Sequence, residues 1–162
     1  MFLEEFKKID PSTLSIAKLI NMIARGQSIY LNHQLEDFGI NETQLHLLFE
    51  ISHHENLNQE TIACRCNINK GAVARSIKKL EDRGFVTRTI DEKNRRQNKV
   101  SLTQKGEKTL SDAISVLNKW EDEVIKKKGY VDREVLQLVL KEMVIKTIEL
   151  NEKEEKHGKR KK

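Results

Sequence analysis

The sequence predicts a mainly α-helical protein with a small β-hairpin, an α+β fold in a single domain of 162 residues. Apolar residues recur at helical spacing through most of the chain, which is 34% charged and contains one proline, Pro11. The segments at about 86–90 and 99–102 predict two short strands. In the second, Val100 and Leu102 alternate with polar residues. The chain is long enough to bury a hydrophobic core.

The sequence carries no signal for a membrane or for export. It has no run of about 18 apolar residues, which is the length that a membrane-spanning helix needs. Its N-terminus, MFLEEFKKID, lacks the basic and then apolar pattern of a signal peptide. We therefore expect a cytoplasmic protein.

The first predicted helix starts at Asp10 and Pro11, because aspartate can cap a helix and proline is tolerated at its first position. The apolar pattern runs to about Leu35. Its first members are Leu14, Ala17, Ile20, Ile23 and Ala24.

A second, short helix follows the break at 38–40. Asn41 and Gln44 have the spacing of a capping box, which predicts the start of this helix. Its apolar face is formed by Leu45, Leu48 and Phe49. The polar segment 53–57 predicts a loop at its end.

A helix-turn-helix is predicted next. Asn58 starts its first helix, in which Ile62 and Cys66 lie one turn apart and face inward. Asn67-Ile68 is the turn, and Asn69 caps the second helix. The buried stripe of that helix is Val73, Ile77 and Leu80, and Gly84 suits a left-handed C-terminal cap.

The two strands then form a hairpin, and Thr103 caps a fifth helix with heptad-like spacing at Leu110, Ile114, Leu117 and Val124. Gly129-Tyr130 ends that helix. Asp132 caps a last helix that runs to about Asn151. A helix-turn-helix with a charged hairpin is a winged helix, which can place a helix in the DNA major groove and a loop in the next minor groove.

The last helix is apolar on more than one face, which indicates a second packing partner. The N-terminal helix is similarly apolar, so we expect both ends of the chain to form a homodimer interface. The alternative is a monomer in which the fifth helix covers them. The expected interface residues are Leu14, Ile20, Val135, Leu138, Val139 and Met143.

These observations divide the single domain into functional parts. Residues 1–36 and 104–151 are expected to be mainly dimerisation helices, and residues 41–103 to be the winged helix. Residues 152–162 are expected to be a frayed basic tail. Between Asn69 and Lys108 there are 12 Lys and Arg against 5 Asp and Glu, which predicts binding to a polyanion.

The outer face of the second helix of the helix-turn-helix is the candidate DNA surface. Gly71, Ala72 and Ala74 keep its first turns small, so that the backbone can approach DNA closely. Arg75 is the candidate for base reading, because a guanidinium can pair with guanine through two hydrogen bonds. The candidates for phosphate contacts are Lys70, Lys78 and Lys79. The alternative for Arg75 is an ordinary surface charge.

The loop of the hairpin, residues 91–97, is too long and too charged for a tight turn. An arginine on a hairpin suits a narrow minor groove, and the spacing leaves open which of two arginines enters it. Asp91 or Glu92 is expected to pair with an arginine and order the loop. The candidate DNA-contacting residues are Lys93, Asn94, Arg95 and Arg96.

Other polar residues give weaker signals. Cys64 and Cys66 are too few for a disulfide framework, and on one helix they point away from each other, which is a poor geometry for a metal. His53 and His54 are expected to be polar loop residues. Tyr30 and His33 could line a ligand pocket or simply pack. The sequence has no motif of a catalytic, cofactor or metal site, so we expect no enzyme, cofactor or metal.

With these motifs in place, the chain resembles the MarR family of transcriptional regulators. The segment DEKNRRQNKVSLTQKG at 91–106 is similar to the wing signature of that family, and 70–86 is similar to its recognition helix and turn. The segments at 39–44 and 58–63 also fit. The chain departs from the wing signature at Asn94, where the family has an aspartate that helps to brace a wing arginine.

The resemblance implies a homodimer that binds a pseudo-palindromic DNA operator and often represses nearby genes. It also implies release by a small, often phenolic or aromatic, ligand between the dimer helices and the winged helix. We therefore expect a sequence-specific regulator that binds double-stranded DNA. The alternatives are a non-specific architectural DNA-binding protein and a winged helix used for protein association.

Overall fold

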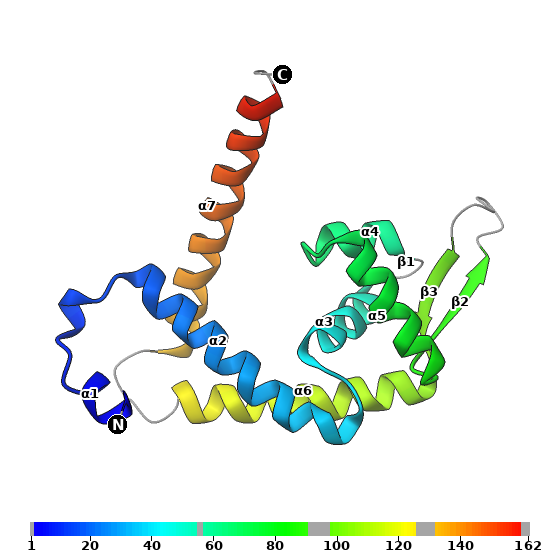
Figure 1. The fold of residues 1–162 in the computed structure, drawn as a ribbon, viewed down its shortest axis with the longest axis horizontal. Helices are drawn as coiled ribbons and strands as arrows, with labels where there is room; N and C mark the ends of the chain where they lie inside the picture. The colour runs from blue at the N-terminus through cyan, green and yellow to red at the C-terminus, as the bar shows by residue number, and fades with distance from the viewer. Residues whose placement is uncertain (1, 55–56, 91–97, 126–131, 160–162) are drawn as a thin grey trace. The chain divides into compact units, whose positions relative to one another are not determined.

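The computed structural model describes residues 2–54, 57–90, 98–125 and 132–159, which are mainly helical with one small sheet (Figure 1). The chain forms two compact units, Met1–Trp120 and Glu121–Lys162. Among the described residues, no helix combines the length and apolar character needed to cross a membrane.

The N-terminal region differs from the prediction. A short helix that the sequence analysis did not predict, α1, covers Phe2–Phe6, and the predicted helix start at Asp10 is wrong. Asp10 caps only a single 3-10 turn, η1 (Pro11–Thr13), by accepting a hydrogen bond of 2.9 Å from the Ser12 amide. The long helix α2 is Ile16–Leu35, and its cap is Ser15. The helix does not start at Asp10 because the backbone is extended at Leu14 and Ser15, between η1 and α2. Ser15 then caps α2.

Helix α3 (Glu42–His53) starts as predicted. Asn41 accepts a hydrogen bond from the Gln44 amide, and the Gln44 side chain accepts one from the Asn41 amide. This capping box is confirmed, and it follows the turn η2 (Glu36–Phe38). Gly39 lies in the left-handed region at φ +70°, which ends η2.

The helix-turn-helix is also confirmed. Asn58 caps α4 (Gln59–Arg65), and Asn69 caps α5 (Lys70–Asp82). Gly84 has the predicted left-handed backbone, at φ +74°. The predicted stripe of α5 is completely buried: Val73, Ile77 and Leu80.

The sheet has three strands rather than the two predicted. Strands β2 (Val86–Ile90) and β3 (Asn98–Leu102) form the expected antiparallel hairpin. The third strand is β1 (Leu57–Asn58), which pairs with the other side of β3 and gives the order β1-β3-β2. The predicted loop at 53–57 is therefore wrong at Leu57, because this residue is buried opposite Val100. A strand of two residues is too short to show an alternating apolar pattern, so the sequence does not predict it.

The hydrophobic core of the first unit joins the C-terminal end of α2 to the winged helix. Its fully buried members include Leu35, Leu47, Leu48, Ile62, Ile77 and Val100, from α2, α3, α4, α5 and β3. Helix α6 (Gln104–Ile125) adds Leu110 and Ala113. As predicted, Thr103 caps this helix, since its hydroxyl accepts a hydrogen bond of 3.1 Å from the Gly106 amide.

The second unit contains the end of α6 and helix α7 (Arg133–Lys159). Asp132 caps α7 as predicted, by accepting a hydrogen bond of 2.8 Å from the Glu134 amide. Helix α7 continues past the expected end at Asn151, so the frayed tail is wrong for 152–159. Glutamate and lysine dominate this last stretch, and both are good helix formers. The predicted break at Gly129-Tyr130 lies outside the described residues.

Candidate nucleic-acid interface

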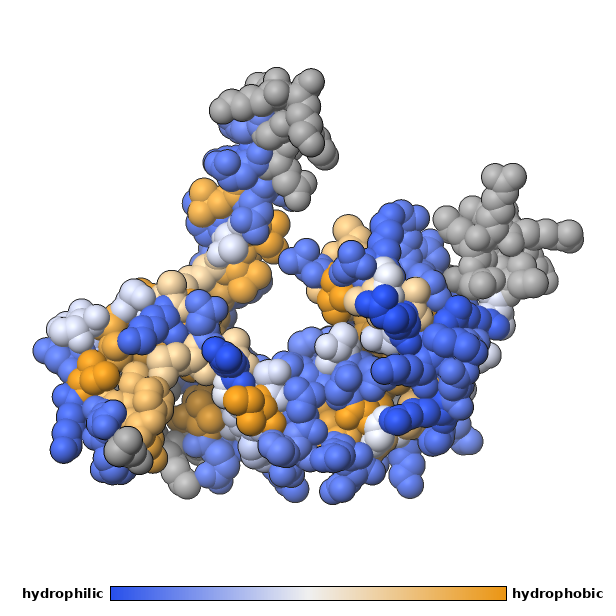
Figure 2. Space-filling model, viewed as in Figure 1, coloured by the Kyte–Doolittle hydropathy of each residue, from blue (hydrophilic) through white to orange (hydrophobic). Residues whose placement is uncertain are grey.

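Helix α5 turns a cationic face to solvent. Ala72 and Ala74 are half-buried at the edges of this face, and its exposed members are Gly71, Arg75, Lys78, Lys79 and Asp82. Figure 2 shows a mainly hydrophilic surface over α5 and the strands. The predicted orientation of α5 is therefore confirmed, whereas contact of these residues with DNA stays a prediction.

The first turn of α5 has small residues, so another molecule can come close to its backbone. The Asn69 side chain accepts a hydrogen bond of 2.8 Å from the Gly71 amide and so caps the helix. A Cβ at Gly71 would lie 3.2 Å from the Asn69 Oδ1, so a larger residue would crowd this cap. The helix dipole and the small residues here together favour an anion near the first turn.

Two of the three predicted phosphate-binding lysines are already ion-paired. Lys70 pairs with Glu60 of α4, and Lys78 Nζ lies 2.7 Å from Asp82 Oδ1. The hydrogen bond from Lys70 lowers the pKa of Glu60, and the hydrogen bond with Asp82 raises the pKa of Lys78. Both shifts favour the charged form, so Glu60 and Lys78 are ionised near neutral pH. Within the described part of the chain, no ion pair engages Arg75 or Lys79.

Several other cations of the basic segment hold the winged helix together. Arg83 donates a hydrogen bond to the Gly39 carbonyl oxygen, which ties the end of α5 to the turn before α3. Lys105 Nζ donates to the Arg83 carbonyl oxygen at 2.7 Å and lies 4.6 Å from the centre of the Phe85 ring. These residues stabilise the fold, so only part of the excess positive charge is available to a polyanion.

Arg88 of strand β2 connects the hairpin to α5. Its Nε lies 3.2 Å from Glu81 Oε2 of α5, an ion pair without good hydrogen-bond geometry, and both side chains are largely buried. This pair was not among the predicted interactions. Strand alternation places Arg88 on the same inner face as Val86, and an arginine on an inner face needs an acidic partner. That signal could have identified it.

The predicted wing residues lie outside the described residues. This applies to Asp91, which was expected to brace the loop, and to the four candidate contact residues Lys93, Asn94, Arg95 and Arg96. The strands that carry this loop are described, and they place its ends at Ile90 and Asn98.

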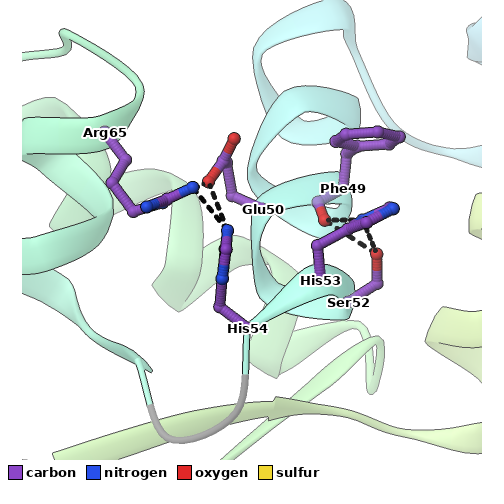
Figure 3. A network of polar contacts seen from close by, with 6 residues as sticks. All are labelled: Phe49, Glu50, Ser52, His53, His54 and Arg65. Carbon is purple, nitrogen blue, oxygen red and sulfur yellow. Dashed lines mark hydrogen bonds and ion pairs between the residues drawn. The ribbon is translucent and has the colours of Figure 1, made fainter.

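A polar network joins α3 to α4, the first helix of the helix-turn-helix (Figure 3). Arg65 Nε donates a hydrogen bond of 2.6 Å to Glu50 Oε2, and a second nitrogen of Arg65 contacts His54 Nε2. The His53 ring stacks on Phe49 at 4.2 Å. The loop prediction is wrong for His53, which is the last residue of α3, and correct for His54, which follows the helix and takes part in this network.

The two cysteines, Tyr30 and His33 were the other residues considered for a functional role. Cys64 is exposed, and Cys66 is half-buried and packs against the core as predicted. Burial and the nearby Glu50 raise the pKa of the Cys66 thiol, which keeps it protonated near neutral pH. Tyr30 and His33 are both exposed on α2.

This arrangement defines a class of protein, the winged helix-turn-helix proteins. It has a helix-turn-helix with an exposed cationic second helix, followed by a hairpin and a further long helix. Comparison with known proteins identifies the family within this class. Residues 40–97 match the MarR family.

The HTH-type transcriptional regulator BilQ of Clostridium symbiosum is 32% identical over 98 residues, which are 60% of this chain and 68% of BilQ. The crystal structure of a MarR transcriptional regulator from Methanosarcina mazei is 31% identical, with a TM-score of 0.72 over 84% of this chain and 96% of that one. A crystal structure of the MepR–DNA complex of S. aureus has a TM-score of 0.70 at 21% identity, over 82% of this chain and 96% of that one, and shows the shared fold. The chain belongs to the MarR family of winged helix-turn-helix transcriptional regulators.

Proposed function

We propose that this protein is a homodimeric repressor that binds a specific double-stranded DNA operator. The observation that carries the proposal is the exposed face of α5, which combines a small first turn with Arg75 and Lys79. A helix of this kind fits the major groove, where an arginine can read guanine and lysines can contact phosphates. The MepR protein of S. aureus shares this fold and was crystallised with DNA, which supports DNA binding by this chain.

The wing extends the proposed interface. The hairpin β2–β3 carries the loop with Arg95 and Arg96, and a narrow minor groove attracts arginine. In this arrangement the helix and the wing of one protomer contact adjacent grooves of a half-site.

Apolar residues exposed on α2 and α7 support the dimer. Ile20 is 42% exposed, and Val135, Leu138 and Val139 are each at least half exposed, whereas Leu14 and Met143 are half-buried. Figure 2 shows hydrophobic residues at the surface of both helices. Exposed apolar surface of this extent is typical of a protein interface. A symmetric dimer would place the two α5 helices about one DNA turn, roughly 10 bp, apart.

The regulatory part of the proposal is repression that a small ligand relieves. Binding over an operator blocks access to the DNA, and a ligand that favours another conformation of the dimer releases it. Such a protein acts on DNA in the cytoplasm.

Selection of bound sequences from a random DNA pool tests the proposal. We expect a pseudo-palindromic motif whose halves are about 10 bp apart, because each protomer contributes one α5. Unrelated DNA should compete roughly a thousandfold less well than the selected sequence. Equal competition by unrelated DNA would instead identify an architectural DNA-binding protein.

A further inference from the structure

A hollow of about 270 Å³ lies in the first unit, between the turn η2, the start of α3 and the C-terminal half of α5. Its polar lining residues are Glu36, Asn41, Gln44, Lys79 and Arg83. Asn41 is the cap of α3 and Gln44 lies in its first turn, so the hollow adjoins the N-terminus of a helix of 12 residues. The dipole of α3 therefore favours an anion in the hollow.

Gln44 adds an unused hydrogen-bond donor to the hollow. The residue is only 5% exposed, and its Oε1 accepts a hydrogen bond of 3.1 Å from the Asn41 amide. Its Nε2 donates to no atom in the described part of the chain. Nε2 is also not sealed inside the protein, because Arg88 Nε is the one side-chain atom among the described residues that is both enclosed and without a hydrogen bond. A buried amide nitrogen normally has a partner, so Gln44 Nε2 points to a ligand that accepts hydrogen bonds.

Two cations supply positive charge at the same place. Arg75, Lys79 and Arg83 follow one another at intervals of four residues, which forms a row along α5 that ends at the hollow. Within the described residues, Lys79 has no ion pair. Arg83 uses one N–H on the Gly39 carbonyl oxygen, which fixes the guanidinium without neutralising its charge. Glu36 is the single acidic residue among the described lining residues and is exposed, so the lining has a net positive charge.

The position of the hollow suits the DNA backbone. With the first turn of α5 at the base edges, as proposed above, the row of cations leads away from the bases toward the wall of the groove, where the phosphates lie. A backbone phosphate has one negative charge and oxygens that only accept hydrogen bonds. It therefore matches a helix N-terminus, the Lys79 ammonium and Gln44 Nε2.

We propose that the hollow binds one phosphate of the DNA backbone and that Gln44 donates a hydrogen bond to it from Nε2. The contact fixes how α5 lies in the major groove and carries no sequence information. This inference rests on the proposed function and adds a third contact surface to α5 and the wing. Free phosphate has the same chemistry, so the two sources need separate tests.

Gln44→Glu tests the donor. Glutamate at this position also completes a capping box, so α3 keeps its start, while the donor becomes an acceptor with a negative charge. We expect binding to the selected operator to weaken by about tenfold or more, and the slope of log affinity against log salt to fall by about 0.9, the value for one phosphate. Urea unfolding should show unchanged or higher stability, because a carboxylate in the first turn suits the helix dipole.

Gln34→Glu, on the exposed side of α2 and outside the hollow, makes the same charge change and serves as the control. Its affinity for the operator should stay within about twofold of the wild-type value. Glu36→Gln removes the acid from the hollow and should raise the affinity about threefold. If Gln44 only caps α3, Gln44→Glu binds the operator like the wild-type protein, and that result overturns the proposal.

Operators with a neutral methylphosphonate at one backbone position at a time locate the contact. Several replacements should weaken binding of the wild-type protein. At one of these positions in each half-site, the loss should be absent in Gln44→Glu, because that phosphate is no longer held, while the losses at the other positions persist. Equal losses in the two proteins at every position overturn the proposal.

Titration of the DNA-free protein with sodium phosphate, followed by NMR of the Gln44 side-chain amide, tests the site without the operator. Sodium chloride at equal ionic strength is the control. We expect the Gln44 resonance to shift in phosphate and not in chloride, with a roughly millimolar dissociation constant, because an isolated ion lacks the other contacts of DNA. Absence of the shift overturns the site.

The same titration separates the two sources of phosphate. Submillimolar binding of phosphate that also releases the operator would assign the hollow to a free anion and overturn its assignment to DNA. If the wild-type protein binds no DNA while phosphate shifts the Gln44 resonance, the proposed function and the DNA contact are both wrong, and the anion site itself stands.

Discussion

The cationic side chains on the outer face of α5 differ in whether they already form an ion pair within the protein. Lys70 and Lys78 each have a carboxylate partner on the protein, whereas Arg75 and Lys79 have no ion pair among the described residues. A lysine that leaves its carboxylate for a phosphate gains little net energy, because one charged contact replaces another. We therefore expect Arg75 and Lys79 to contribute most to DNA affinity.

Arg75→Ala is expected to weaken operator binding by about 1–3 kcal/mol and to relax the preference at one base position. The loss arises because alanine cannot form the paired hydrogen bonds to a guanine edge. Binding assays on the selected operator and on variants of each base measure both effects. Arg25→Ala, an exposed arginine of α2, is the control and should bind normally. An equal loss on every sequence would show that Arg75 contacts phosphate instead.

Glu60→Gln is expected to raise DNA affinity, because it frees the charge of Lys70 while glutamine preserves the shape of the side chain. The slope of log affinity against log salt should become steeper by about 0.9, the value for one more phosphate contact. Titration at several salt concentrations measures it. Glu4→Gln removes a carboxylate paired with Lys7 in α1 and serves as the control. An unchanged slope would exclude Lys70 from the interface.

At the scale of elements, the junction between α5, β2 and α6 sets the position of the wing. The Thr103 hydroxyl donates a hydrogen bond of 2.6 Å to the Gly84 carbonyl oxygen, and the Thr103 amide donates one of 3.0 Å to the Phe85 carbonyl oxygen. Gly106, in the first turn of α6, packs directly on the Phe85 backbone. The end of α5, the start of β2 and α6 thus share one small contact.

Gly106→Ala is expected to destabilise the protein by about 1–3 kcal/mol or more, because a Cβ there would overlap the Phe85 carbonyl oxygen. Urea unfolding measures the change in the free energy of unfolding. Gly26→Ala is the matched control, since a Cβ at Gly26 in α2 meets no atom within 4 Å. This control should leave stability unchanged or raise it by up to about 1 kcal/mol. Equal effects of the two substitutions would contradict the role of the junction.

At the scale of the whole molecule, the terminal helices offer apolar surface to a second copy. Val135, Leu138 and Val139 are exposed on α7, and Ile16, Ile20 and Ile23 are exposed on α2. Water around so many apolar groups is unfavourable, and burial in a dimer removes that cost. We expect DNA binding to depend on the same contact, because only a dimer would present two α5 helices to two half-sites.

At micromolar concentration we expect the wild-type protein to be a dimer and Leu138→Glu to be a monomer, because the proposed interface would have to bury a carboxylate. Sedimentation velocity measures the mass, and the operator assay should show a parallel loss of affinity. Lys141→Glu, an exposed charge change on the same helix, is the control and should stay dimeric. A dimeric Leu138→Glu variant, or a monomeric wild-type protein, would contradict the proposed interface.

Much of the winged helix could be predicted from the sequence because its determinants are local. Asn41 with Gln44, Asn69 and Gly84 each act on backbone within a few residues, and the period of Val73, Ile77 and Leu80 identifies the buried side of α5. The exposure of the cationic face follows from that buried side.

Only the tertiary structure revealed the features that depend on residues far apart in the chain. Leu57 becomes part of a strand because Val100 lies opposite it, and His54 meets Arg65 beside a pocket that three separate segments build. Local preferences are readable from neighbouring residues, whereas such contacts depend on how the chain closes on itself. These tertiary contacts form by packing and charge pairing between residues distant in the sequence, and no spacing of residues predicts them.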